Sequence, residues 1–325
     1  MKMKNRTKSL TKDVLVLLPA HNEELTISST VHQIRKYLPD VEIILIDNAS
    51  VDSTPQVAKS LGLTVLNEPR RGKGFAVQRG FDYASSKDCL AVALMDADAT
   101  YGAEKLIDAL DLVLTNMADM VVGSRVATEQ KSIDSATLAH YRFGHQIGNR
   151  FFSWVGRVLL PSGIEDVLSG WRVMSRAFVS SFPGGSRGFE IEAQLNSHAY
   201  ELNSAVANIP VAYYSRPKGS NSKLNTYSDG WRILRTTLKN FRRNRPLLAF
   251  SILSLPWLLT TFWLMYLPFK TYLETGLVPY LPRLVAGIGT FLIASLLWVS
   301  GMLLERIREI RIQLILGKYH ALKGS

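Results

Sequence analysis

Two carboxylates separated by one alanine, Asp96 and Asp98, end the apolar part of the segment Leu90–Tyr101 (LAVALMDADATY). Six of the seven residues from 90 to 96 are apolar, which is typical of a strand buried on both faces of a parallel sheet. Neighbouring carboxylates repel each other unless a cation lies between them, and Mg²⁺ or Mn²⁺ shared with substrate phosphates would relieve the repulsion. The pair predicts a divalent-metal site, with a turn carrying two solvated acids as the alternative.

Polar side chains also follow three other apolar runs of strand length, at 14–18, 41–46 and 120–123. With the first pair they form four clusters: Asn22 and Glu23, Asp47 and Asn48, Asp96 and Asp98, Ser124 and Arg125. The carboxyl ends of parallel strands meet at one edge of a sheet, where ligands bind, so these side chains are predicted to converge. A nucleotide suits such a set, because carboxylates and amides can hold its base and ribose while a metal takes its diphosphate.

A short glycine-containing loop, Arg71-Gly72-Lys73-Gly74, precedes a helical pattern that runs to Ala84. Its basic side chains can neutralise phosphate charge, and its glycines allow the backbone to approach a ligand closely. The glycine spacing matches neither G-x-G-x-x-G nor G-x-x-x-x-G-K-[ST], which argues against a Rossmann dehydrogenase and a P-loop NTPase.

Helical patterns separate the strand-like runs. One covers 27–38 and is closed by Pro39; a second begins at Ser53 or Thr54 as the cap and ends at Gly62. A strand at 63–66 and helices at 73–84 and 104–114 follow. The alternation predicts an α/β doubly wound sheet with right-handed crossovers.

Composition limits the classes of protein further. The chain has 325 residues, a formal net charge of +11 and a single cysteine, Cys89, which excludes an internal disulfide and is predicted to lie in the core. The basic tail 1–12 has no apolar run of signal-peptide type behind it, so the N-terminal part is expected in the cytoplasm.

Two uncharged segments, Leu247–Leu267 and Leu284–Leu304, are each about 31 Å long as helices, which matches a hydrocarbon core of roughly 30 Å. Basic residues crowd the flanks at 229–246 and 305–325, whereas the connecting loop is poor in them. The positive-inside rule then predicts an integral membrane protein with both termini inside. This placement accounts for the basic charge without a nucleic-acid partner.

The ordered motifs LLPAHNEE, IDNASVDST, RRGKGFAVQRGF, LMDADATY and VVGSR resemble family 2 glycosyltransferases of GT-A fold. The closest resemblance within them is to the polyprenyl-phosphate branch, similar to dolichyl-phosphate mannose or glucose synthases. It covers most of residues 13–235. It implies a GT-A domain with a mostly parallel sheet at 13–228, a basic juxtamembrane helix at 229–246, two transmembrane helices within 247–304 and a cytoplasmic tail at 305–325.

The implied reaction is inverting transfer of a sugar from a nucleotide-sugar donor to polyprenyl phosphate, with Mg²⁺ or Mn²⁺ as cofactor and the catalytic domain on the cytoplasmic face. The stretch SKLNTYSDGWRIL is more similar to glucose-type members, which favours UDP-glucose or a related UDP-sugar. A GDP-mannose donor, or diacylglycerol or ceramide as acceptor, is the alternative. The resemblance is also compatible with a homo-oligomer.

The resemblance implies roles for individual residues. The metal ligands are Asp96 and Asp98. The nucleotide-sugar contacts are Pro19, Ala20, Asn22, Glu23, Asp47, Asn48, Lys73, Asp96 and Ala97. The catalytic set is Asp98, Asp166, Arg125, Arg172 and Arg216. The acceptor-phosphate contacts are Arg125, Ser169 and Lys223.

Three points stay open in this assignment. Asp166 orients the acceptor, acts as a base if the acceptor phosphate arrives protonated, or merely pairs with Arg172. Either Glu190 or Glu192 orients a basic residue. The mannose synthases carry a metal-binding Gln two residues after the second Asp, but this chain has Thr100 there, which puts a third protein ligand in doubt. The apolar stripe in 133–160 predicts either a helix at the membrane interface or one packed on the core.

Three other functions share some of these features. A processive polysaccharide synthase would carry Gln-x-x-Arg-Trp, which the sequence lacks, and a sugar nucleotidyltransferase would carry a glycine-rich N-terminal signature and no membrane helices. A non-enzymatic binding module would not need four polar clusters on one sheet edge.

Overall fold

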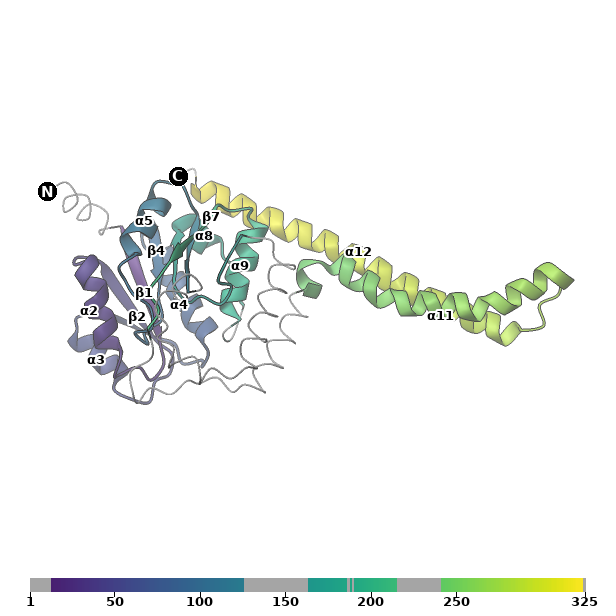
Figure 1. Cartoon of the computed structure of the whole chain (residues 1–325), viewed down its shortest axis with the longest axis horizontal. Helices are drawn as coiled ribbons and strands as arrows, with labels where there is room; N and C mark the ends of the chain where they lie inside the picture. The colour runs from purple at the N-terminus through teal and green to yellow at the C-terminus, as the bar shows by residue number, and fades with distance from the viewer. Residues whose placement is uncertain (1–12, 126–162, 186–187, 189, 215–240, 324–325) are drawn as a thin grey trace, which may run out of the picture. The chain divides into compact units, whose positions relative to one another are not determined.

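The computed structural model describes residues 13–125, 163–185, 188, 190–214 and 241–323. Its contacts divide the chain into two units (Figure 1). The first, called the sheet unit here, consists of residues 1–223 and 315–325, and the second, called the helical unit, consists of residues 224–314. The insertion at 133–160, most of the basic segment 229–246, Arg216 and Lys223 lie outside the described residues.

The sheet unit is built on a seven-stranded sheet in the order β3-β2-β1-β4-β6-β5-β7. The strands are β1 Val14–Ala20, β2 Glu42–Asp47, β3 Thr64–Asn67, β4 Ala91–Leu94, β5 Met120–Ser124, β6 Arg172–Ser175 and β7 Val206–Pro210. Strands β3, β2, β1 and β4 pair in parallel, as do β5 and β7, while β6 runs antiparallel between β4 and β5. The predicted mostly parallel α/β sheet is confirmed, and β6 is an addition that the alternation pattern did not predict.

Helices cover both faces of this sheet (Figure 1). Alternate residues of β1 enter different hydrophobic clusters, Val16 on one face and Leu17 on the other. Helices α2 Ile27–Tyr37, α3 Thr54–Ser60 and α5 Leu106–Leu114 contribute to the first cluster. Helices α4 Lys73–Ser86, α8 Arg176–Ser181 and α9 Ile191–Glu201 contribute to the second, which also holds Cys89 with 4% of its surface exposed, as predicted.

The predicted cap of α3 is wrong in its chemistry. Neither Ser53 nor Thr54 caps the helix with its side chain; Asp52 does so, because its Oδ1 accepts the Thr54 N–H at 3.0 Å. Gly62 follows the helix with φ +73°, a left-handed conformation that glycine adopts without strain and that ends the helix as predicted.

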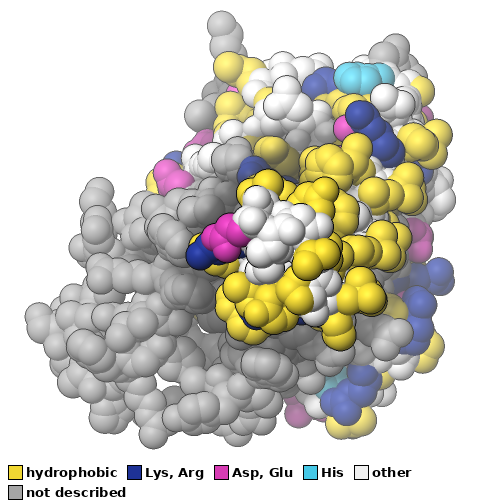
Figure 2. Space-filling model, turned by 90° about the vertical axis from the view of Figure 1, so that its right-hand side faces the viewer, with side chains coloured by type: hydrophobic (Ala, Val, Ile, Leu, Met, Phe, Trp, Pro, Cys, Tyr) yellow, Lys and Arg dark blue, Asp and Glu magenta, His cyan; other side chains and the backbone are white. Residues whose placement is uncertain are grey.

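The helical unit contains α11 Pro246–Thr275 and the beginning of α12 Leu281–Lys323. Both helices are long and apolar enough to cross a membrane. The two helices approach closely at Gly301, where an added Cβ would meet Phe250 at 2.9 Å. The hydroxyls of Thr261 and Thr290 form a hydrogen bond of 2.9 Å between the helices. Large apolar side chains of both helices are exposed, and the space-filling view shows hydrophobic side chains gathered on the face turned to the viewer (Figure 2).

Two long apolar helices are therefore present where the sequence predicts them. The second helix continues beyond Leu304, since residues 305–323 of the segment predicted as a cytoplasmic tail are also helical. Its last part, from Ile315, belongs to the sheet unit.

Candidate active site

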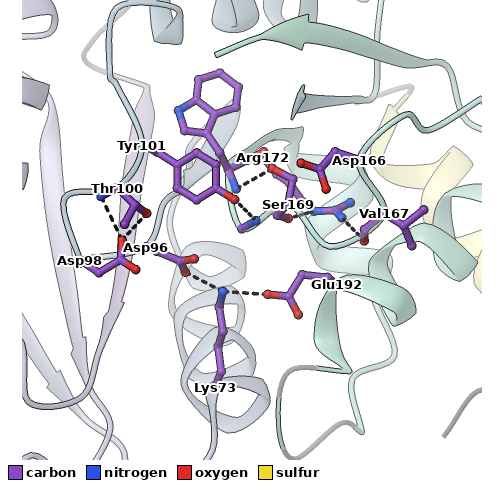
Figure 3. Close-up of polar contacts among 12 residues, drawn as sticks. Lys73, Asp96, Asp98, Thr100, Tyr101, Asp166, Val167, Ser169, Arg172 and Glu192 are labelled. Atoms are coloured by element: carbon purple, nitrogen blue, oxygen red, sulfur yellow. Dashed lines mark hydrogen bonds and ion pairs between the residues drawn. The ribbon is translucent and has the colours of Figure 1, made fainter. Parts of the chain in front are cut away.

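The loop after β4 carries the two carboxylates in a fixed conformation (Figure 3). Asp98 is 6% exposed, and its Oδ1 accepts the Thr100 N–H at 3.1 Å and the Thr100 hydroxyl at 2.6 Å. Ala99, which lies between Asp98 and Thr100, has φ +57°. This left-handed conformation costs an alanine about 1 kcal/mol and turns the chain sharply. The Thr30 hydroxyl of α2 donates to the Ala97 carbonyl at 3.2 Å. Thr100, where the mannose synthases have a glutamine, thus supports Asp98 from within the loop.

Lys73 lies between Asp96 and a second carboxylate, Glu192 (Figure 3). Its Nζ is 2.6 Å from Asp96 Oδ1 and 2.7 Å from Glu192 Oε1. Burial lowers the pKa of Lys73, but the charges of Asp96 and Glu192 outweigh it and hold the pKa above its ordinary value. Burial, with the nearby charge of Asp96, raises the pKa of Glu192 against the opposing effect of Lys73. Of the two glutamates considered from the sequence, Glu192 pairs with a basic side chain, that of Lys73.

The donor set suits a divalent metal that shares a phosphate ligand. No group of three or more His, Cys, Asp or Glu side chains in the described residues could hold a metal. A metal at this loop would therefore be held by the Asp96 and Asp98 pair together with ligands from outside the protein. Mg²⁺ commonly uses one or two carboxylates and completes its shell with water and substrate phosphates. The two carboxylates therefore fit a metal held jointly with a diphosphate.

The loop before β6 lies directly on this site. A Cβ added to Gly170 would collide with the Asp96 carboxylate, so a larger residue there would force this carboxylate or the loop to shift. The Gly170 N–H donates to the Tyr101 hydroxyl at 3.2 Å. Tyr101 is 3% exposed, and burial raises its pKa to about 12. Tyr101 thus joins the carboxylate loop to the 163–170 loop.

Arg125 and Asp166 form a bidentate pair at the other end of that loop. Asp166 Oδ2 and Oδ1 accept from Arg125 Nε at 2.6 Å and Nη2 at 2.9 Å. The guanidinium lies 5.3 Å from the Tyr213 ring centre and 6.0 Å from that of Tyr101. Burial lowers the pKa of Arg125, but its hydrogen bonds to Asp166 outweigh this effect and raise that pKa. The alternative that Asp166 pairs with Arg172 is wrong, since its partner is Arg125.

Arg172, at the start of β6, is fully buried and holds the same loop from below (Figure 3). It donates to the carbonyls of Ser169 at 3.1 Å and Val167 at 3.4 Å, and to Asn196 Oδ1 at 2.7 Å. Burial lowers its pKa to about 10, which leaves it charged at neutral pH. The Ser169 hydroxyl accepts the Trp171 N–H at 3.2 Å and is also buried. The side chains of Arg172 and Ser169 therefore hold the 163–170 loop in its conformation.

The ends of β1 and β2 form the opposite side of the site. Pro19 and Ala20 pair with Ile46 and Asp47 in the sheet, and Asp47 Oδ1 accepts the Ser50 N–H at 3.2 Å. Asn22, with φ +55°, accepts the Val51 N–H on its Oδ1 at 2.8 Å.

Asn48 and Glu23, on this side of the site, form hydrogen bonds with neighbouring residues. Asn48 Oδ1 accepts the Gly72 N–H at 2.7 Å, which fixes the turn leading into Lys73. The Glu23 N–H donates to the Thr54 hydroxyl at 2.8 Å, and Glu23 Oε2 accepts from the Thr26 hydroxyl at 2.9 Å.

The structure therefore brings the four polar clusters to one edge of the sheet. The described chain before Arg216 ends beside the carboxylate loop, where the Tyr214 N–H donates to the Thr100 carbonyl at 2.7 Å. Sequence reasoning missed Tyr101, Gly170 and Asn196. The first two lie within segments already singled out, but only contacts across the sheet reveal what they touch.

Comparisons with known proteins agree with this geometry. Residues 15–179 match the family model Glycosyl transferase family 2. The low-salt glycan biosynthesis hexosyltransferase Agl6 of Haloferax volcanii is 28% identical over 228 residues, 69% of this chain, but the match spans only 53% of Agl6. Polyprenol monophosphomannose synthase of Mycolicibacterium smegmatis is 25% identical over 64% of this chain and 80% of its own length.

A solved structure shares the fold. Glucosyl-3-phosphoglycerate synthase of Mycobacterium tuberculosis, in complex with Mn²⁺ and UDP-glucose, superposes with a TM-score of 0.54 at 21% identity, over 73% of this chain and 82% of that one. At this identity the likeness establishes the fold alone. The family model covers more than half of the chain and includes both carboxylates, Arg125 and Asp166. The chain therefore belongs to glycosyl transferase family 2, with a GT-A-like sheet that presents its polar clusters at one edge.

Proposed function

We propose that this chain transfers a sugar from a nucleotide-sugar to polyprenyl phosphate at a membrane surface, with a divalent metal at Asp96 and Asp98. The observation that carries the proposal is the bridge of Tyr101 and Gly170 between two charged centres. One centre is the carboxylate loop, suited to a metal and a diphosphate; the other is the guanidinium of Arg125, suited to a phosphate. Two anionic substrates would thus meet across one short loop.

The metal, when bound, would stabilise the negative charge that develops on the leaving diphosphate. An oxygen of the acceptor phosphate attacks the anomeric carbon, and the bond from that carbon to the nucleoside diphosphate breaks with its electron pair on the diphosphate. Attack from the opposite side inverts the anomeric configuration. Lys73 lies beside Asp96 and supplies a further positive charge at the diphosphate. Arg216 and Lys223 are proposed to add to it.

Asp166 positions Arg125 in this mechanism. Both of its oxygens already accept hydrogen bonds from Arg125, and an acceptor phosphate is ionised near neutral pH without a strong base. Arg125 keeps its charge at neutral pH, because its hydrogen bonds to Asp166 raise its pKa against the effect of burial. Arg172 and Ser169 shape the loop that carries Asp166.

Polyprenyl phosphate is the favoured acceptor because Arg125 offers a planar cation that suits a phosphate better than a neutral hydroxyl. Relatives named polyprenol monophosphomannose synthase and undecaprenyl-phosphate mannosyltransferase support the same acceptor class. The mannose in those names makes a GDP-mannose donor the second candidate beside UDP-glucose. The apolar helices α11 and α12 are proposed to cross the membrane, with the sheet unit on the cytoplasmic side.

The test is sugar transfer by the purified full chain in detergent, with Mn²⁺, undecaprenyl phosphate and a panel of labelled UDP- and GDP-sugars. We expect transfer from one donor, and a loss of at least about 100-fold in Asp98→Asn. The matched control is Asp108→Asn, which removes an exposed acid paired with Lys105 and should leave the rate unchanged. Transfer that survives both a chelator and Asp98→Asn would contradict the metal site, and no transfer to any polyprenyl phosphate would contradict the acceptor.

A further inference from the structure

The end of α12 is part of the sheet unit although it lies more than one hundred residues beyond the last strand. Residues 315–325 group with residues 1–223 by their contacts. Tyr319 is 3% exposed within the hydrophobic cluster of the α4, α8 and α9 face, where Ile315, Leu316 and Leu322 also pack. The buried Tyr319 and its half-buried neighbours contribute hydrophobic stabilisation on this face of the sheet.

A polar contact fixes the last turn of the helix on the sheet. Lys323 Nζ is 2.7 Å from Asp119 Oδ1 and 2.9 Å from the Tyr319 hydroxyl. The Asp119 side chain is only 7% exposed, and its Oδ2 accepts the Ala205 N–H at 3.0 Å. An ion pair whose acid is buried and already hydrogen-bonded has a defined geometry, unlike a mobile pair between two exposed side chains.

The chain consequently leaves the sheet unit after residue 223 and returns to it at residue 315, with the apolar helices in between. A sheet unit joined to these helices at one point can turn about that connection. A second attachment removes much of this freedom, because two connections must be satisfied together.

We propose that residues 315–323 are a docking segment. They hold the end of α12 on the sheet unit, which is thereby attached to the apolar helices at a second point and loses freedom to move against them during transfer to an acceptor in the membrane. The proposal rests on the proposed function for its kinetic consequence. Asp119 immediately precedes β5, and Arg125 immediately follows it, so the dock and the candidate acceptor-phosphate contact lie at opposite ends of one strand. Asp119 and Arg125 are six residues apart along an extended chain, which is about 20 Å, so the dock lies away from the candidate acceptor-phosphate contact.

The first experiment measures the dock without any assay of activity. The full chain in lipid nanodiscs is compared with Tyr319→Ala/Lys323→Glu by hydrogen–deuterium exchange. We expect amides in 312–323 to exchange about tenfold faster or more in the variant, while those in 284–304 are unchanged. Lys318→Glu is the matched control, because Lys318 is exposed and lies five residues before Lys323 on the same helix. Its substitution changes the charge by the same amount as Lys323→Glu. Equal exchange in the variant and the wild type would overturn the dock.

The second experiment measures the consequence of this restraint. Two acceptors are compared in the same proteins: undecaprenyl phosphate in the bilayer and water-soluble citronellyl phosphate. We expect the variant to lose about tenfold in transfer to the bilayer acceptor and to keep transfer to the soluble one, because only the bilayer acceptor requires the sheet unit to be restrained at the membrane.

Equal losses on both acceptors, or a loss on neither, would overturn the restraining role. If the double variant no longer binds UDP, the milder substitution Lys323→Gln replaces it. We expect this variant also to lose transfer to the bilayer acceptor and to keep transfer to the soluble one. Failure of the wild type on both acceptors would instead contradict the proposed function, and the exchange experiment would still decide whether the segment docks.

Discussion

At the scale of single residues, Asp166 holds the positively charged guanidinium of Arg125 in a partly buried position where it can bind a phosphate. The carboxylate holds the guanidinium by two hydrogen bonds, and the rings of Tyr101 and Tyr213 flank it. Arginine in this setting is pre-organised for a phosphate, since little side-chain freedom remains to be lost on binding.

Asp166→Asn should weaken the use of the acceptor while leaving the donor side unchanged. The amide cannot accept two charge-assisted hydrogen bonds, so Arg125 loses its fixed orientation. We expect KM for undecaprenyl phosphate to rise about tenfold, with UDP affinity unchanged. Steady-state kinetics and calorimetric titration with UDP measure the two quantities. A loss of UDP binding that equals the loss of transfer would contradict this role.

Tyr101 predicts a change of stability with pH. Its pKa is raised to about 12 by burial, above the ordinary value of 10, so its contribution to stability is complete below pH 10 and is lost as the pH rises toward 12. Two pKa units correspond to about 3 kcal/mol. Between pH 9.5 and 11.5 the melting temperature of the wild type should fall more steeply than that of Tyr101→Phe. Tyr213→Phe is the control, and parallel curves for the wild type and Tyr101→Phe would refute the assignment.

At the scale of elements, the 163–170 loop depends on three neighbours for its conformation. Arg172 of β6 and Asn196 of α9 bind its carbonyls, and Tyr101 accepts its Gly170 N–H. Because β6 inserts antiparallel between β4 and β5, the loop preceding it emerges beside the carboxylate loop after β4. The topology of the sheet thus sets the distance between the two charged centres.

Gly170→Ala tests this close approach. The added Cβ would collide with the Asp96 carboxylate and displace either the loop or the carboxylate. We expect Mn²⁺ affinity in the presence of UDP to fall about tenfold, followed by the electron paramagnetic resonance of free Mn²⁺. Gly317→Ala, where an added Cβ meets nothing within 4 Å, is the control. Unchanged Mn²⁺ affinity in Gly170→Ala would show that the loop and Asp96 do not limit each other.

At the scale of the whole molecule, the long apolar helices and the basic segments around them predict a topology. The connection between α11 and α12 spans 276–280 and should lie outside, with both termini inside. In a Cys89→Ser background, Val278→Cys should react with a membrane-impermeant maleimide in intact cells, whereas Ser325→Cys should react only after lysis. The reverse pattern would place the sheet unit on the side of the membrane where nucleotide-sugars are absent.

The sequence by itself determined the α/β alternation, the polar clusters at the strand ends and the two apolar helices. These features are local: buried strands read as apolar runs, helices as a repeat near 3.6 residues, and a membrane-length helix as an uncharged run. The same locality explains the buried Cys89 and the end of α3 at Gly62.

Only the tertiary structure decided which charges meet. Asp166 pairs with Arg125, which is 41 positions away, in place of the nearby Arg172, and Lys73 lies between Asp96 and Glu192. Lys323 reaches Asp119 across 204 positions. Such contacts depend on strand order and on which helix covers which face, and no periodic pattern along the chain encodes them. Side-chain pairing is set by where the backbone brings two groups together, so these partners could not be predicted from their spacing in the sequence.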